Sequence, residues 1–170
     1  MVARKSNTAT KPAEREMVIT HIFDAPRELV FKAWTEPEHL VQWWGPKGFT
    51  TPHCKIELRP GGVFHYCMRS PEGRDYWGRG VYREIVAPEK LVYTDTFSDP
   101  EGNPVEPAYY DGMDPEWPSE SLVTVTFSEQ GGKTKVTLHH GVSESLAKRT
   151  GAKQGWTEML ERLADYLARL

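Results

Sequence analysis

The chain has 170 residues, of which 38% are hydrophobic, 11% aromatic and 26% charged, and these values predict one globular domain. Six Trp, six Phe and seven Tyr exclude a disordered chain, and the lack of an apolar run of about 20 residues excludes a helical membrane span. The net charge of −3 provides no attraction to nucleic acids or acidic membranes, so neither is expected as a partner. Two cysteines, Cys54 and Cys67, are too few for a secreted disulfide scaffold, which indicates a cytoplasmic protein.

The chain begins with a polar and basic stretch, residues 1–14, that shows no periodicity. We expect this stretch to be a disordered leader, followed by a single domain over residues 15–170. The first predicted strand covers residues 15–24, where β-prone apolar residues gather.

Two short helices are expected after this strand. Asp24 is expected to cap the first helix, with Pro26 in its first turn. Thr35 and Glu38 have the spacing of a capping box, which predicts the start of the second helix. That helix is expected to end at Gly45-Pro46.

Six further strands are expected, because short β-prone runs alternate with turns that contain Gly and Pro. This pattern is typical of an antiparallel meander. The Gly78-Arg79-Gly80 segment marks a bend or a bulge within one of these strands. The expected strands cover residues 54–58, 63–69, 76–86, 91–97, 123–128 and 136–138.

The stretch of residues 98–120 contains five prolines and no periodicity, and a loop of this length is commonly functional. Its prolines and glycines are expected to keep it out of the sheet. Four of its side chains, Tyr109, Tyr110, Met113 and Trp117, require an apolar surface. We therefore expect residues 99–117 to cover one mouth of an internal cavity. The alternative is an interface with a second subunit, which would make the protein a homodimer.

The C-terminal residues 143–170 give the strongest helix signal, with an apolar stripe at spacings of three and four residues. Gly151 and Gly155 lie one turn apart within it, which indicates a kink or a close backbone approach. An antiparallel sheet must cover one face, and this helix is the largest element available. The order of elements predicts an α+β fold in which a curved, seven-stranded antiparallel sheet wraps around the C-terminal helix.

A series of short motifs occurs in order along this framework. In order and spacing these motifs resemble the START-like superfamily, also called SRPBCC or helix-grip. The branch they resemble most is the homologues of the activator of heat-shock protein 90 ATPase, C-terminal-domain type. The resemblance covers residues 16–170 and implies a hydrophobic cavity between sheet and C-terminal helix, in proteins that bind or transform small apolar molecules. The motifs are Phe23-Asp24-Ala25-Pro26, Val30-Phe31-Lys32-Ala33-Trp34, Gln42-Trp43-Trp44-Gly45-Pro46, Arg59-Pro60-Gly61-Gly62, Pro88-Glu89-Lys90-Leu91-Val92-Tyr93-Thr94, Thr124-Val125-Thr126-Phe127 and Gly155-Trp156.

The apolar and aromatic side chains of the strands and of the C-terminal helix are the candidate lining of this cavity. The alternative is that these side chains simply form the core. The resemblance favours the cavity. The candidate ligand residues are Trp43, Trp44, Phe64, Tyr66, Tyr93, Phe97, Trp117, Val123, Val125, Trp156 and Leu160.

Polar chemistry has little support in the sequence. Adjacent pairs such as His53-Cys54 and His139-His140 point to opposite faces of a strand, and no zinc-binding motif occurs, so no metal site is expected. No nucleophile motif or nucleotide-binding fingerprint occurs either, so catalytic residues stay unassigned and no cofactor is expected. Several polar groups could act within a cavity, although a solvated outer face is the simpler interpretation of each. They are His65, Arg69, Arg79, Tyr82, Glu84, Asp95 and His140.

Three classes of function follow. The first is a protein that binds a small hydrophobic molecule in the sheet–helix cavity. The second is an enzyme of the cyclase or hydrolase kind acting on a small apolar substrate, although no residue requires catalysis. The third is a chaperone-associated protein, which is weakest because the resemblance covers only the C-terminal domain of such activators.

Overall fold

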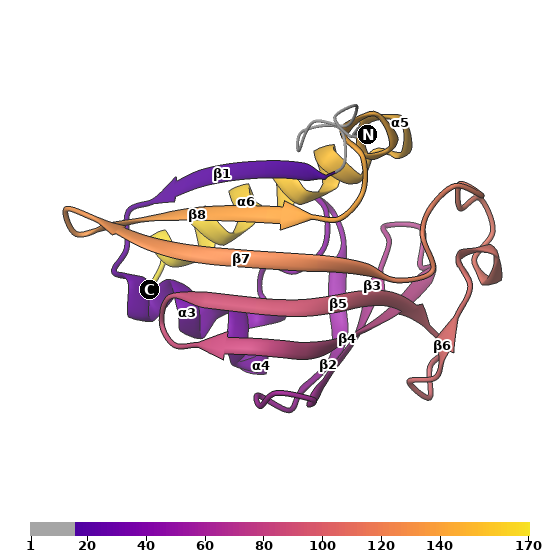
Figure 1. The fold of residues 1–170 in the computed structure, drawn as a ribbon, viewed down its shortest axis with the longest axis horizontal. Coiled ribbons are helices and arrows are strands. Elements are labelled where there is room, and N and C mark those ends of the chain that lie inside the picture. The colour runs from indigo at the N-terminus through magenta and orange to yellow at the C-terminus, as the bar shows by residue number, and fades with distance from the viewer. Residues whose placement is uncertain (1–15) are drawn as a thin grey trace, which may run out of the picture.

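The computed structural model describes residues 16–170, and the leader predicted over residues 1–14 lies outside the described residues. One antiparallel sheet in the order β1-β8-β7-β5-β4-β3-β2 curves around α6, with α3 and α4 at one end (Figure 1). The strands are β1 Met17–Phe23, β2 Thr50–Ile56, β3 Val63–Arg69, β4 Asp75–Val86, β5 Lys90–Ser98, β6 Pro104–Val105, β7 Ser121–Gln130 and β8 Lys133–His140. The helices are α3 Arg27–Thr35, α4 Pro37–Leu40, the 3₁₀ turn η1 Pro107–Tyr109, α5 Glu144–Thr150 and α6 Ala152–Ala168. The predicted α+β helix-grip fold with seven main strands is confirmed.

Alternation along the strands decides which side chains face α6. In β7, Val123, Val125 and Phe127 are buried, and their register partners in β8 include Leu138 and Val136, which are buried as well. The Thr and Ser side chains between them lie on the other face. The helix-facing side of this hairpin is therefore a continuous apolar surface.

Both predicted helix caps are wrong, although the two short helices themselves are present. The N-cap of α3 is Pro26, in extended conformation and without a side-chain cap, so Asp24 does not cap this helix. Thr35 is the last residue of α3, and the N-cap position of α4 is Glu36, which makes no side-chain cap hydrogen bond. Thr35 Oγ1 instead donates to the Phe31 carbonyl at 2.9 Å, within its own helix. The helix α4 ends at Leu40, so Trp43 and Trp44 follow in a turn.

The C-terminal helix is broken into two at Gly151, which has a φ of 83°. That left-handed conformation is inexpensive for glycine, and it allows Gly151 to end α5 and begin α6. Ser143 Oγ accepts from the Leu146 amide at 3.1 Å and caps α5. The predicted kink is therefore a true break, one turn before Gly155.

The two halves of α6 have different surroundings. In the C-terminal half, Leu160, Leu163 and Leu167 are buried in the main apolar core. Phe31 from α3 and Phe127 from β7 are part of the same core, with ring centroids 5.3 Å apart. Below we call this region the packed half. No helix within residues 16–170 is both long and apolar enough to cross a membrane.

Candidate functional site

A cavity of about 580 Å³ lies beside the N-terminal half of α6, a volume typical of sites for drug-sized ligands. Its walls are the inner faces of β3 and β5, the turn after α4, the α5–α6 junction and part of the loop after η1. We call this region the cavity half. The lining residues are Trp44, Pro46, Phe49, Tyr66, Met68, Tyr76, Tyr93, Asp95, Thr96, Phe97, Gly112, Met113, Asp114, Trp117, His140, Arg149, Thr150, Gly151, Ala152, Gly155, Trp156 and Met159.

Two glycines of β4 determine how the cavity wall is built. A Cβ on Gly78 would lie 2.4 Å from the Tyr66 hydroxyl, and a Cβ on Gly80 would lie 2.5 Å from the Thr94 carbonyl and 3.1 Å from the Tyr93 ring. The two shorter distances are impossible for a real side chain, and the third is tighter than most real contacts. The glycines therefore let Tyr66 from β3 and Tyr93 from β5 lie across β4. The predicted bend is in fact a site of close approach.

Asp95 places a carboxylate in this aromatic wall. Asp95 lies on the same inner face of β5 as Tyr93 and Phe97, at alternate positions of the strand. The Tyr66 hydroxyl donates a hydrogen bond to its Oδ1 at 3.3 Å. Burial raises the pKa of Asp95 to about 7, and the Tyr66 bond offsets only part of this effect. The Tyr66 and Tyr93 hydroxyls have pKa values well above their ordinary value because they are buried beside this carboxyl. Asp95 can thus exchange a proton near neutral pH.

Two further polar atoms in the wall lack partners. Trp44 Nε1 and the Tyr93 hydroxyl are buried without a hydrogen bond within the described residues. Buried donors of this kind are rare in native proteins. The wall around Asp95 therefore has hydrogen-bonding capacity that the described part of the chain does not use.

In the same sheet, His140 at the end of β8 also lines the cavity, and both of its ring nitrogens have hydrogen-bond partners. The Trp156 indole N–H donates to its Nδ1 at 3.1 Å, and its Nε2 lies 2.8 Å from Ser121 Oγ. An indole can only donate, so Nδ1 must be unprotonated and the proton must lie on Nε2. Burial lowers the pKa of His140 to about 4, which is consistent with this neutral tautomer. Trp117 packs against the imidazole in a T-shaped arrangement, with ring centroids 5.8 Å apart.

The Ser121–His140 pair resembles a nucleophile and its base, but its protonation is wrong for that role. A base must accept the hydroxyl proton through an unprotonated nitrogen. Here Nε2 donates to Ser121, and Trp156 occupies Nδ1. The arrangement fixes the position of Trp156 in the cavity wall, and it does not activate Ser121.

The segment of residues 99–117, which we call the cover, lies over one side of the cavity. Met113 and Trp117 line the cavity. Tyr110 points back to the sheet, where its hydroxyl accepts from the Trp77 amide at 2.9 Å and donates to the Ser98 carbonyl at 2.5 Å. Tyr109, by contrast, is 56% exposed. One expectation is wrong: the cover does extend the sheet, because β6 pairs with the end of β5. Only two residues pair, and Pro104 is one of them.

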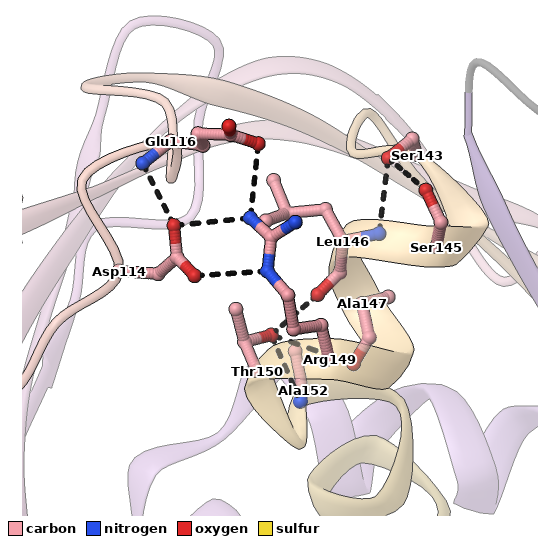
Figure 2. A network of polar contacts seen from close by, with 9 residues as sticks. All are labelled: Asp114, Glu116, Ser143, Ser145, Leu146, Ala147, Arg149, Thr150 and Ala152. Atoms are coloured by element: carbon pink, nitrogen blue, oxygen red, sulfur yellow. Dashed lines mark hydrogen bonds and ion pairs between the residues drawn. The ribbon is translucent and has the colours of Figure 1, made fainter.

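Ion pairs fasten the cover to α5. The Arg149 guanidinium donates to both carboxylate oxygens of Asp114 at 3.1 Å and to Glu116 at 2.9 Å, as Figure 2 shows. Asp114 also accepts from the Glu116 amide at 2.8 Å. The pKa of Asp114 is lowered, mainly by its bond to Arg149. Arg149 and Asp114 both line the cavity, so this contact closes part of its rim. We call it the latch.

The eleven candidate ligand residues divide into two groups. Those in the cavity wall are Trp44, Tyr66, Tyr93, Phe97, Trp117 and Trp156. Those buried in the apolar core, outside the cavity lining, are Trp43, Phe64, Val123, Val125 and Leu160. For example, Trp43 Nε1 donates to the Ala33 carbonyl at 3.0 Å, which holds this ring between α3 and the following turn.

Residue type alone does not show which of the candidate polar groups face the cavity. Asp95 and His140 face the cavity, although an outer face was the simpler expectation for both. Arg69 instead pairs with Asp75 on the surface, at 2.7 Å. One signal does distinguish Asp95: it is in phase with the buried Leu91 and Tyr93 of its strand. Within residues 16–170, no three His, Cys, Asp or Glu side chains converge as metal ligands would.

Several solved structures share this fold. A protein from Arthrobacter aurescens is 24% identical with a TM-score of 0.78, over 95% of this chain and 90% of its own. A protein from Mycobacterium smegmatis is 24% identical with a TM-score of 0.76, over 94% of both chains. One from Nitrosomonas europaea is 24% identical with a TM-score of 0.74, over 92% of this chain and 96% of its own.

These likenesses show the fold alone, and no functionally curated protein matches the sequence. The match at the level of families is broader. Residues 24–168 match the family described as Activator of Hsp90 ATPase homolog 1-like protein. This match covers nearly all of the described residues. The chain therefore belongs to the Activator of Hsp90 ATPase homolog 1-like family, within the START-like superfamily.

Proposed function

We propose that the protein binds a small, mainly apolar molecule in the cavity between the sheet and the N-terminal half of α6. The observation that carries this proposal is the cavity itself, about 580 Å³ in volume and lined mainly by aromatic rings and methionines. Few polar groups lie among them, as is usual in ligand sites. The family and its helix-grip fold are consistent with a ligand-binding domain.

A variant that fills the cavity tests this proposal. Gly155 lines the cavity from α6, and the nearest atom to an added Cβ would be Pro46 Cγ, at 3.5 Å. Gly155→Leu should therefore occupy the space while α6 stays intact. Ala168→Leu is the matched control, because Ala168 is exposed at the other end of the same helix.

The measurement is quenching of Trp fluorescence by an apolar naphthalene probe, together with native mass spectrometry of freshly purified protein. The wild type and Ala168→Leu should bind the probe. Binding should quench the fluorescence because Trp44, Trp117 and Trp156 line the cavity. Gly155→Leu should bind at least tenfold more weakly and keep its thermal stability. Equal binding by all three proteins would refute the proposal.

Acid–base catalysis on the bound molecule is a second candidate, and Asp95 is the observation that favours it. A carboxyl with a pKa near 7 in an apolar cavity can both give and take a proton. The Ser121–His140 pair supports no hydrolase, because its imidazole protonation is wrong. Incubating the protein with a molecule that co-purifies with it separates the two: a binder leaves the molecule unchanged, and an enzyme consumes it.

A further inference from the structure

The charges in the cavity wall are unbalanced. Three lining side chains carry a charge near neutral pH, namely Asp95, Asp114 and Arg149. Arg149 is already paired with Asp114 and with Glu116 at the rim. None of the ion pairs formed within residues 16–170 involves Asp95. The protein supplies a carboxylate here, and the described part supplies it no cation.

The groups that surround Asp95 are polar or aromatic, and all of them are neutral. Tyr66 from β3 donates a hydrogen bond to it, and Tyr93 and Phe97 flank it on β5. Ser121 of β7 is its register partner. His140 of β8 also faces the cavity, and its Nδ1 is occupied by Trp156. None of these groups can neutralise an ionised Asp95.

The rings of the wall favour a cation as well. The face of an aromatic ring is negative, so Trp and Tyr faces attract cations, and quaternary ammonium groups are commonly bound in this way. Trp44, Tyr66 and Trp156 form a cluster in the wall, where Trp44 makes T-shaped contacts with the other two rings at centroid distances of 5.4 and 5.7 Å. A cationic nitrogen near Asp95 would thus meet a carboxylate in a wall that is rich in aromatic rings.

From this geometry we propose that the cavity binds an apolar molecule that carries one cationic nitrogen, with the nitrogen at Asp95 and the hydrocarbon part along Trp44, Trp156 and Met159. This proposal rests on the proposed function and names the ligand class. An anion would face Asp95 without a counter-charge. A neutral molecule would gain no attraction from an ionised Asp95, and its binding would favour the protonated form of that carboxyl.

Three naphthalene probes of similar size test the ligand class by titration calorimetry and fluorescence at about pH 8. They are the cation (1-naphthylmethyl)trimethylammonium, its uncharged carbon analogue 1-neopentylnaphthalene, and the anion 1-naphthaleneacetate. The wild type should bind the ammonium at least tenfold more tightly than the carbon analogue, and should bind the acetate most weakly. Asp95→Asn should reduce the ammonium preference to within threefold and should bind the carbon analogue at least as tightly as the wild type does.

Asp165→Asn is the control for net charge, because Asp165 is exposed on α6 outside the cavity lining. It should keep the full preference. The pH dependence provides a second measurement that needs no variant. The quaternary probe does not titrate, so its preference in the wild type should fall from pH 8 to pH 5.5 as Asp95 takes up a proton.

Each other outcome overturns the inference. If the carbon analogue or the acetate binds as tightly as the ammonium, the cation is wrong but the cavity still binds apolar molecules. If the preference survives in Asp95→Asn, the cation does not lie at this carboxylate. If none of the three probes binds, the proposed function fails together with the ligand class.

Discussion

The two halves of α6 face two different interiors, although both belong to one apolar stripe. In the packed half, Leu160, Leu163 and Leu167 meet a core in which large side chains from α3 and β7 fill the space. In the cavity half, Trp156 and Met159 face a volume of about 580 Å³. On the cavity side, the glycines of β4 let Tyr66 and Tyr93 lie across that strand, and these rings form part of the cavity wall. Hydrophobic periodicity is the same in both halves, so a stripe alone does not determine whether an interior is filled.

The largest expected effect compares one phenylalanine from each half. Phe127 is 1% exposed in the packed half, so Phe127→Ala should reduce the free energy of unfolding by about 3–5 kcal/mol. Phe97 borders the cavity on one side, so Phe97→Ala removes fewer contacts and should cost less than about half as much. Urea denaturation of both variants measures the difference. Equal losses would show that the cavity wall is packed as tightly as the core.

The second prediction concerns the pH dependence of stability that Asp95 creates. Its pKa is about 7 in the folded protein against an ordinary value near 3.8, so between these values the native state holds a proton that the unfolded state has lost. The Asp95 contribution to stability is therefore full below about pH 4 and is lost as the pH rises to 7.

Asp95→Asn removes this loss. The variant should match the wild type near pH 4 and exceed it by about 2–4 kcal/mol at pH 8, at 1.4 kcal/mol per unit of pKa. Urea denaturation across this range checks the result, with Asp165→Asn as the control for net charge. A constant difference at all pH values would show that the carboxyl is not perturbed.

His140, two strands away from Asp95 in the same sheet, should give the opposite slope. Its pKa is about 4 when folded and 6.5 ordinarily, so the unfolded state binds the extra proton between these values. Its contribution is thus present above pH 6.5 and is lost as the pH falls toward 4. His140→Asn should lose about 1–3 kcal/mol at pH 7, because Trp156 and Ser121 lose a partner, and should lose less at pH 4.5. A variant equally destabilised at both pH values would contradict this assignment.

Much of the fold follows from the sequence, because its signals are local. Alternation in β7 and the apolar stripe of α6 indicate which faces meet, and Gly151 marks the break between the helices. The caps fail for a physical reason. Thr35 has the right spacing to Glu38, but it is still the last residue of α3, and the N-cap position of α4 is Glu36. A spacing motif shows where a cap could lie and not where the helix begins.

The candidate site is less predictable, because it depends on empty space. Trp43 and Trp44 are adjacent and equally apolar, but the Ala33 carbonyl holds Trp43 in the core, whereas Trp44 borders the cavity. Nothing local separates them. Gly78 and Gly80 are informative in retrospect, since two glycines at alternate positions remove the side chains from one face of a strand. That signal becomes specific only once Tyr66 and Tyr93 are known to lie over them.

The smallest expected effect on stability is at the latch, where the cavity half is closed by charges and not by packing. Arg149, Asp114 and Glu116 are surface groups, and exposed ion pairs add little to stability. Arg149→Gln should therefore leave the unfolding midpoint almost unchanged. It should still free the cover, because Met113 and Trp117 are carried by the segment that the latch fastens.

The expected result of Arg149→Gln is a severalfold faster release of a cavity-bound naphthalene probe, measured by stopped-flow displacement. Lys148→Gln is the matched control, since Lys148 is the preceding residue of α5 and pairs only with Glu144, at 3.7 Å, among the described residues. Salt at about 0.5 M should speed release from the wild type and leave Arg149→Gln unaffected, because screening weakens the ion pairs. If release is equally fast in all three proteins at low salt, the cover is held by the packing of Trp117 on His140, and the latch has no part in closing the cavity.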